Sequence, residues 1–242
     1  MKQFEEVIKI MEESSGYSTL GRLYQKVDVS NWKTKTPFAS IRRIVQDKRY
    51  FFKIKPGLWA LNSHKNIVLQ NFSIDKACSK KKEEEFNHTY YQGLLVEVGN
   101  LEGFETYVAA QDKNKMYLSK PLREYLTAKE FYKFTYEPII KQVNTVDVCW
   151  FNERKYPNSV FEVEHSTGIQ TSLVKFLNLQ DFNTRFNIVA DKVREREFKS
   201  KLSSSAFDCI RSRVKFIKYD SLSDYHTKLF ELSVLKKDFA NE

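Results

Sequence analysis

Two stretches, Val146-Asp147-Val148-Cys149-Trp150-Phe151 and Val160-Phe161-Glu162-Val163-Glu164-His165-Ser166-Thr167-Gly168, decide the fold of this chain. Both are rich in β-branched and aromatic residues, which favour β-strands. The turn-forming dipeptide Pro157-Asn158 lies between them. Together they predict a β-hairpin.

Acidic side chains are concentrated on this hairpin. Glu162 and Glu164 are two residues apart, so they point to the same face of their strand, while Phe161 and Val163 are expected to face a core. If Asp147 lies across from Glu162, three carboxylates converge on one small volume. Carboxylates held this close repel one another unless a divalent cation neutralises them, and ligation by oxygen alone favours Mg²⁺. The pattern predicts a magnesium site; the alternative is an amphipathic strand with a solvated acidic face.

The segments around the hairpin alternate between helical and strand patterns. A helix is predicted to begin in the charged run 80–85 and to end near Gly99, with Glu97 turned toward its buried side. Further strands are predicted at 103–110, 185–190 and 214–217, and further helices at 171–177, 192–202 and 221–230. Such alternation is typical of an α/β domain.

An acidic residue at a strand end, followed by Glu-x-Glu on the next strand, resembles the PD-(D/E)XK nuclease family, which includes most type II restriction endonucleases. The resemblance spans about residues 85–225 and implies a central mixed sheet flanked by helices. It also implies Mg²⁺ as cofactor, with Mn²⁺ able to replace it. By position, it implies that Asp147, Glu162 and Glu97 hold the metal and form the catalytic set together with Glu164. The family usually has a lysine where Glu164 stands, and Lys175 on the following predicted helix is the alternative source of that cation.

The first 62 residues have the pattern of three short helices followed by a hairpin. Apolar residues recur at helical spacing from Phe4 to Met11 and from Leu20 to Val27. Thr36-Pro37 is a start signal for a third helix, and Pro56-Gly57 suits the turn of a hairpin. This order is typical of a winged helix-turn-helix, in which the third helix usually enters the major groove of DNA.

The run Asn31-Trp32-Lys33-Thr34-Lys35-Thr36-Pro37, together with Gly57-Leu58-Trp59-Ala60-Leu61, resembles the HARE-HTH family of winged helices. Members of that family occur beside restriction nucleases and chromatin proteins, so the resemblance implies that residues 1–62 bind DNA. We expect Trp32 and Trp59 to belong to the core. The candidate DNA contacts are Lys33, Lys35, Ser40, Arg42, Arg43 and Gln46.

The composition indicates a globular protein with a polyanionic partner. Hydrophobic residues make up 41% and aromatic residues 14% of the 242 residues, which is enough for substantial cores. The net charge is +9, and residues 1–70 carry 13 Lys and Arg against 6 Asp and Glu, which favours nucleic acid binding there. Neither a membrane span nor a signal peptide is recognisable, so we expect a soluble protein in the cytoplasm of a bacterium or archaeon. The three cysteines are far apart and are expected to be free thiols.

These patterns lead to one predicted architecture and function. We expect an α/β (α+β) chain with a winged helix at 1–62, a linker at 63–79 and a nuclease domain at 80–242. The predicted activity is Mg²⁺-dependent hydrolysis of double-stranded DNA by a sequence-specific type II restriction endonuclease, acting as a homodimer because two strands need two active sites. The alternatives are a non-catalytic DNA-binding regulator and a nuclease directed to modified bases. No His-Glu-x-x-His, glycine-rich phosphate loop or Gly-x-Ser-x-Gly pattern is present, so no nucleotide cofactor is expected, and His64, His88 and His226 are interpreted as unpaired.

Overall fold

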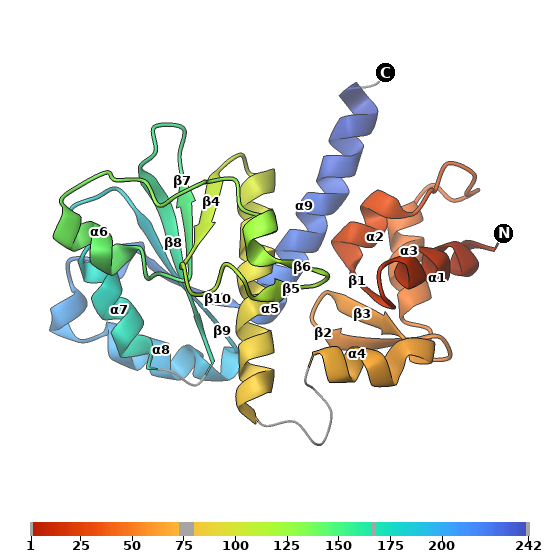
Figure 1. Ribbon diagram of the computed structural model, residues 1–242, viewed down its shortest axis with the longest axis horizontal. Helices are drawn as coiled ribbons and strands as arrows, with labels where there is room; N and C mark the ends of the chain where they lie inside the picture. Colours follow the sequence, from red (N-terminus) through yellow and green to blue (C-terminus); the bar gives the residue numbers. More distant parts are fainter. Residues whose placement is uncertain (1, 73–79, 166–167, 241–242) are drawn as a thin grey trace. The chain divides into compact units, whose positions relative to one another are not determined.

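The chain forms two compact units in a computed structural model that describes residues 2–72, 80–165 and 168–240 (Figure 1). The first unit combines Met1–Glu83 with Ser223–Glu242, and the second unit is Glu84–Leu222. The predicted strand end at Ser166-Thr167 and the cysteine at position 78 lie outside the described residues. The proposed domain at 80–242 differs from this division, because the segment from Ser223 onward groups with the N-terminal residues.

The N-terminal part of the first unit contains three helices and a three-stranded antiparallel sheet. The helices are α1 (Gln3–Glu13), α2 (Leu20–Lys26) and α3 (Pro37–Val45), and the strands are β1 (Tyr17–Thr19), β2 (Phe51–Lys55) and β3 (Leu58–Leu61), in the order β1-β3-β2. Thr19 caps α2 by accepting a hydrogen bond from the Arg22 amide, and Pro37 occupies the first turn of α3. The three predicted helices and the hairpin are confirmed. The sequence pattern does not reveal β1, because three residues are too few for a recognisable alternation.

The apolar faces of these helices form the core of the first unit. Val7, Ile41 and Val45 are completely buried within it. Trp32 and Trp59 pack against this core partly buried, as the sequence predicts. Each fully buried aliphatic side chain contributes roughly 1.5–3 kcal/mol relative to an exposed one, so this small unit has a core of its own.

The segment proposed as a linker is partly helical. It begins with a 3₁₀ turn (Asn62–His64) and continues as α4 (Lys65–Asn71), in which Val68 is completely buried. The last helix, α9 (Tyr219–Ala240), contributes its residues from Ser223 onward to the same unit. A Cβ atom added to Gly21 would lie 2.7 Å from Cγ of Phe230, so the backbone of α2 directly contacts the ring on α9.

A five-stranded mixed sheet forms the centre of the second unit. Its strands are β4 (Glu105–Val108), β7 (Val148–Phe151), β8 (Pro157–Glu164), β9 (Arg185–Ala190) and β10 (Val214–Lys218), in the order β10-β9-β8-β7-β4. Strands β8, β9 and β10 are parallel, and β7 is antiparallel to both β8 and β4. The predicted hairpin is β7–β8, and the predicted central mixed sheet is confirmed.

Helices cover both faces of this sheet (Figure 1). Helix α5 (Lys80–Leu101) lies on one face, and α6 (Glu137–Val143), α7 (Ile169–Leu177) and α8 (Glu195–Leu202) lie on the other. The remaining elements are the small hairpin of β5 (Met116–Tyr117) and β6 (Lys120–Pro121), and the 3₁₀ turns Leu122–Glu124, Lys192–Arg194, Ser205–Phe207 and Arg211–Arg213. Among the described residues, no helix combines the length and the apolar character that crossing a membrane requires.

Because both faces of the sheet are covered, strand β8 is buried on both of its sides. Phe161 faces α5 and contacts Trp150, whose indole N–H donates to the Leu95 carbonyl of that helix. Glu162 and Glu164 point to the opposite face and are only 3% and 4% exposed. Charged side chains are costly in such surroundings unless they are compensated. The amphipathic alternative, a solvated acidic face, is therefore wrong.

Two aromatic contacts fix α5 within the second unit. The ring of Tyr91 stacks on the ring of Tyr219, with centroids 3.7 Å apart and planes 6° from parallel. At Gly93 the helix backbone lies against Tyr117, because an added Cβ would approach within 2.1 Å of the ring. These contacts set the position of α5, which carries several polar side chains toward the sheet.

Candidate active site

Asp147 and Glu162 lie opposite each other at the end of the β7–β8 hairpin. Val148 pairs with Phe161, and continuing this antiparallel register by one residue places Asp147 across from Glu162. The Asp147 carboxylate accepts a hydrogen bond of 2.7 Å from the backbone N–H of Val163, which fixes its orientation. The strand register thus places Asp147 across from Glu162, and the convergence of their carboxylates on a metal stays a prediction.

Lys175 on α7 binds the carboxylate of Glu162. Its ammonium nitrogen lies 2.8 Å from Oε2 and 3.0 Å from Oε1, and it also donates to the Thr145 carbonyl at 3.2 Å. Helix α7 follows β8 directly along the chain and packs over the sheet face that carries Glu162. The positive charge beside Glu162 thus comes from a helix, and Glu164 occupies the strand position two residues after Glu162.

The electrostatics of Glu162 are unusual for a carboxylate. Burial raises the pKa of Glu162 well above its ordinary range, and the negative charge of Asp147 raises it further. The ammonium of Lys175 acts in the opposite direction. The positive charge of Lys175 thus does not fully offset the burial of Glu162 and its repulsion by Asp147. A bound cation would supply the additional positive charge.

Glu164 is held by two partners on the same sheet face. The Ser172 hydroxyl donates to Glu164 and also lies 3.3 Å from Oε2 of Glu162, so it links the two glutamates. The guanidinium of Arg194 lies 3.6 Å from Glu164. Both partners are nearly buried, since the Arg194 side chain is 13% exposed and Ser172 is 1% exposed. Glu164 therefore has its own compensation, independent of Lys175.

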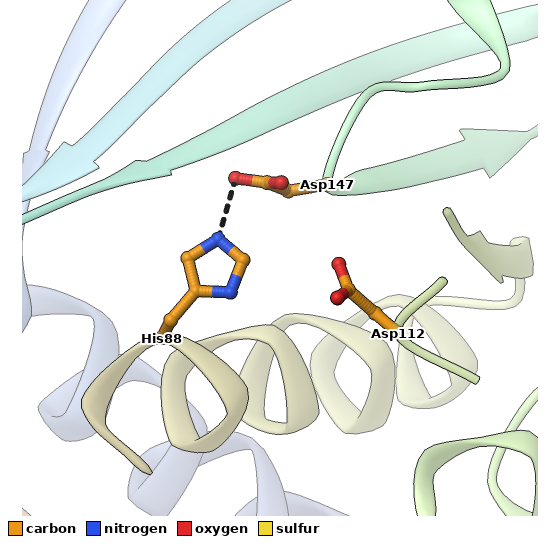
Figure 2. A group of neighbouring side chains, drawn as sticks. All are labelled: His88, Asp112 and Asp147. Carbon is orange, nitrogen blue, oxygen red and sulfur yellow. Dashed lines mark hydrogen bonds and ion pairs between the residues drawn. The ribbon is translucent and has the colours of Figure 1, made fainter. Parts of the chain in front are cut away.

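A second group of polar side chains meets Asp147 from the α5 side (Figure 2). Nε2 of His88 lies 3.0 Å from Oδ2 of Asp147, and ligand atoms of His88, Asp112 and Asp147 all lie within 4.8 Å of one another. His88 comes from α5 and Asp112 from the turn after β4. The interpretation of His88 as unpaired is wrong. The sequence does contain one signal for His88. His88 and Gln92 are four residues apart, so both lie on the same face of the predicted helix.

The neighbours of this group are themselves polar and buried. Burial disfavours the charged imidazole, but the hydrogen bond and charge of Asp147 outweigh it and raise the pKa of His88. Asp112 is 1% exposed and accepts from Nε2 of Gln92 at 2.7 Å, while Lys115 approaches it at 2.8 Å. Sequence reasoning missed Asp112 because no local pattern connects it to the hairpin.

The structure does not bring Glu97 to this site. Its carboxylate accepts a hydrogen bond of 2.7 Å from the Tyr117 hydroxyl. Glu97 follows His88 by nine residues on α5, which corresponds to about 13 Å along the helix and about half a turn around it. His88 is therefore the α5 side chain that faces Asp147.

The candidate DNA contacts of the first unit differ in accessibility. Lys33, Lys35, Arg43 and Gln46 are exposed, while Ser40 and Arg42 are half-buried. The hydroxyl of Ser40 donates to the Thr36 carbonyl, and Arg42 interacts with the Tyr24 hydroxyl. Arg43 borders a cavity of about 410 Å³ that Lys2 and Arg49 also line, and Gln46 borders one of about 470 Å³ lined by Lys48, Lys53 and Lys65. Basic side chains thus line two hollows at the C-terminal end of α3, together with Asp47, which pairs with Arg49.

The second unit is a mixed α/β domain in which Glu162 contacts a lysine, and Asp147, at the start of the adjacent strand, contacts a histidine. Residues 69–242 match the family model described as the type II restriction enzyme NmeDI C-terminal domain, and the chain belongs to this family. The type II restriction enzyme NmeDI of Neisseria meningitidis serogroup C is 30% identical to it over 146 residues, which cover 55% of this chain and 42% of that enzyme. The chain thus matches less than half the length of this relative. No solved structure matches it.

Proposed function

We propose that this protein is a Mg²⁺-dependent endonuclease that hydrolyses double-stranded DNA at specific sequences. The observation that carries the proposal is the buried pair of Asp147, directly before β7, and Glu162 on the adjacent strand β8, with the ammonium of Lys175 on Glu162. Two carboxylates and a lysine at the end of a mixed sheet are the arrangement that the resemblance to PD-(D/E)XK nucleases implies. Membership of the NmeDI C-terminal domain family supports the same activity.

The side chains of this pair fit a magnesium ion. Asp147 and Glu162 offer carboxylate oxygens, the ligands that Mg²⁺ prefers, and Mg²⁺ typically takes only one or two of them from a protein. The raised pKa of Glu162 reflects repulsion and burial that a cation would offset. Bound Mg²⁺ would supply Lewis-acid stabilisation of the negative charge that develops on the phosphate during hydrolysis, and Mn²⁺ can take the same place.

The other side chains of this sheet face would position the pair and balance its charge. Lys175 would keep a positive charge beside Glu162 and near the reacting phosphate, the role that the family assigns to its strand lysine. Glu164 would act by holding Ser172, which links it to Glu162. We therefore assign Asp147, Glu162 and Lys175 direct roles and Glu164 a positioning role.

The first unit is proposed to bind DNA as a HARE-HTH-type winged helix. Its three helices and its β2–β3 hairpin have the element order of that fold, and basic side chains are concentrated around α3. Among the candidate contacts, Arg43 and Gln46 have the best access to a groove, because Arg43 is exposed on α3 and Gln46 is exposed at its C-cap. Arg42 is better suited to stabilise the unit through Tyr24. A homodimer would supply one active site for each strand.

The test is cleavage of unmodified and methylated plasmid and phage DNA, with and without Mg²⁺, resolved on a gel. Wild-type protein is expected to give discrete Mg²⁺-dependent fragments. Asp147→Asn and Glu162→Gln should each reduce the rate at least about a hundredfold, since metal charge stabilisation is worth several kcal/mol, while DNA binding persists. The control Glu153→Gln removes an exposed carboxylate from the β7–β8 turn and should cut normally.

Three other outcomes would decide against this proposal. Intact DNA under every condition, together with a mobility shift, would identify a DNA-binding regulator. Cleavage of methylated DNA alone would identify a modification-directed nuclease. Normal cleavage by both site variants would show that catalysis takes place elsewhere in the chain.

A further inference from the structure

His88, Asp112 and Asp147 form a donor set that differs chemically from the carboxylate pair. It combines one imidazole nitrogen with two carboxylates, and the three side chains point toward one another from three separate segments (Figure 2). Asp112 and Asp147 are only 1% and 8% exposed, so the group lies inside the second unit. A nitrogen donor distinguishes this group from the all-oxygen environment that Mg²⁺ prefers.

An unpaired polar atom adjoins this group. Gln92 is completely buried, and its Nε2 donates to Oδ2 of Asp112 at 2.7 Å and lies 3.4 Å from the Asp147 carbonyl. Its Oε1 has no hydrogen-bond partner in the part of the chain that the structure describes. The amide nitrogen points this way because the Asp112 carboxylate and the Asp147 carbonyl are both acceptors, and an oxygen in its place would meet no donor from either. A buried carbonyl oxygen without a donor costs free energy, so this atom indicates a missing partner beside Asp112 and Asp147.

We propose that His88, Asp112 and Asp147 bind a divalent transition-metal ion in preference to Mg²⁺, with the amide oxygen of Gln92 accepting a hydrogen bond from a water on that ion. The imidazole provides the preference, because nitrogen ligands bind first-row transition metals more strongly than they bind Mg²⁺. Asp147 belongs to both this group and the proposed catalytic pair. The site therefore adds a metal position on the α5 side of Asp147.

The charged groups around the site define its competitor. Lys115 lies 2.8 Å from Oδ1 of Asp112 and 3.9 Å from Glu85, and its side chain is 31% exposed. Without metal, His88 can compensate the charge of Asp147, and Lys115 can compensate the charge of Asp112. That arrangement leaves Oε1 of Gln92 unexplained. A bound cation would replace Lys115 at Asp112, and the partly exposed lysine can turn toward solvent or Glu85.

The direct test is Mn²⁺ binding by the full chain after chelator treatment, followed by electron paramagnetic resonance of free Mn²⁺ in the presence of excess Mg²⁺. Wild-type protein should bind one Mn²⁺ that Mg²⁺ does not displace. Pulsed measurements on that ion should detect ¹⁴N coupling from the His88 imidazole. His88→Gln should remove the coupling and weaken binding at least about tenfold, the least that a lost ligand is expected to cost. Binding without ¹⁴N coupling, or with unchanged affinity in His88→Gln, would overturn the proposal.

A second variant keeps the test decisive if His88→Gln unfolds. Lys115→Met removes the cation that competes for Asp112, so Mn²⁺ should bind several-fold more tightly, a gain that misfolding cannot produce. Unchanged or weaker binding in a folded Lys115→Met protein would exclude Asp112 as a ligand. Glu153→Gln is the matched control and should retain the ¹⁴N coupling, because this exposed carboxylate of the β7–β8 turn lies outside the donor set.

The outcome is separable from the proposed nuclease activity, on which the inference does not rest. A protein that binds Mn²⁺ through His88 but never cuts DNA would retain this site and lose the proposed function. A protein that cuts DNA with Mg²⁺ but shows no His88-dependent Mn²⁺ binding would retain the proposed function and lose this metal site.

Discussion

The ammonium of Lys175 lies within 3.0 Å of both carboxylate oxygens of Glu162, although the two residues belong to a helix and a strand. Glu162 is nearly buried, while the side chain of Lys175 is 28% exposed. The lysine can therefore reach both the buried carboxylate and an incoming phosphate. This geometry makes Lys175 the side chain whose removal best tests the proposed chemistry.

Lys175→Met should reduce DNA cleavage at least about tenfold while leaving DNA affinity within about twofold. The reason is that the charge is expected to stabilise the transition state at the scissile phosphate rather than the binding of the DNA. Lys175→Arg should recover part of the rate, since it restores the charge with altered geometry. Single-turnover cleavage measures both. The exposed Lys201 on α8 provides the control Lys201→Met, which should behave as wild type. Equal rates in Lys175→Met and wild type would remove the lysine from the mechanism.

Glu162→Gln should raise the melting temperature of the metal-free protein by a few degrees while it abolishes cleavage. The substitution removes a carboxylate whose charged form is disfavoured by burial and by repulsion from Asp147, as its raised pKa indicates, and the amide that replaces it carries no charge. Added Mg²⁺ should stabilise the wild type by mass action and have less effect on the variant. Thermal melts in chelator and in Mg²⁺ provide the comparison. A lower melting temperature for Glu162→Gln in chelator would contradict this account.

Arg43→Ala should weaken DNA binding several-fold and decrease its dependence on salt by about one released counterion, because Arg43 is exposed on α3 among other basic side chains. Lys9→Ala removes the same charge from α1 of the same unit and should have a smaller effect. Fluorescence anisotropy at several salt concentrations measures both. If the two variants lose the same affinity, net charge rather than α3 accounts for binding.

Gly93→Ala should destabilise the second unit by about 1–3 kcal/mol. The added Cβ would meet the buried Tyr117 ring at 2.1 Å, and either α5 or the ring has to move. Gly168→Ala is the matched control, because the nearest atom to its Cβ is 3.7 Å away and its φ is −78°. Urea unfolding followed by circular dichroism distinguishes them. A Gly93→Ala protein as stable as Gly168→Ala would disprove the close approach.

Stability should decrease steeply above pH 10. Burial raises the pKa of Tyr91. Burial also raises the pKa of Tyr219, and the neighbouring Tyr91 raises it further. Both hydroxyls therefore stay protonated in the folded chain at pH values at which they ionise in the unfolded chain. Their contribution is complete below the unfolded pKa of about 10 and is lost as the pH rises above it. Tyr91→Phe should make the loss less steep. Urea midpoints between pH 8 and 11 measure the slope, and identical slopes for both proteins would refute the assignment.

The sequence predicted the parts of this fold that local patterns encode. The β7–β8 hairpin follows from the alternation around Glu162, and α3 follows from Thr36-Pro37 with its apolar spacing. The short strand β1 and the helix α4 were missed because three to seven residues carry little periodicity. The grouping of α9 with the N-terminal unit depends on tertiary contacts such as Gly21 with Phe230, which no sequence window contains.

The residues of the candidate site likewise include some that local patterns predict and others that only tertiary packing places there. Asp147 and Glu162 could be predicted because hairpin register brings them together, and Lys175 was a stated alternative. The sequence pattern favours Glu97 rather than His88 on α5, because the rotation of α5 relative to the sheet is set by packing at Tyr91 and Gly93, which the pattern does not contain. A helix pattern identifies a buried face, but it does not identify which turn of that face lies next to a distant strand end.

The position of Lys175 on a helix also affects how related proteins can be recognised. A search pattern that requires glutamate and lysine two positions apart on one strand would pass over this chain, since its lysine follows Glu162 by thirteen residues. The two intervals of the site should also diverge differently. The Asp147-to-Glu162 interval can change wherever the hairpin turn lengthens, whereas inserting one residue within α7 between Ile169 and Lys175 would rotate the lysine by about 100°. Homologues are therefore expected to keep the spacing from the start of α7 to this lysine more strictly than the spacing across the hairpin.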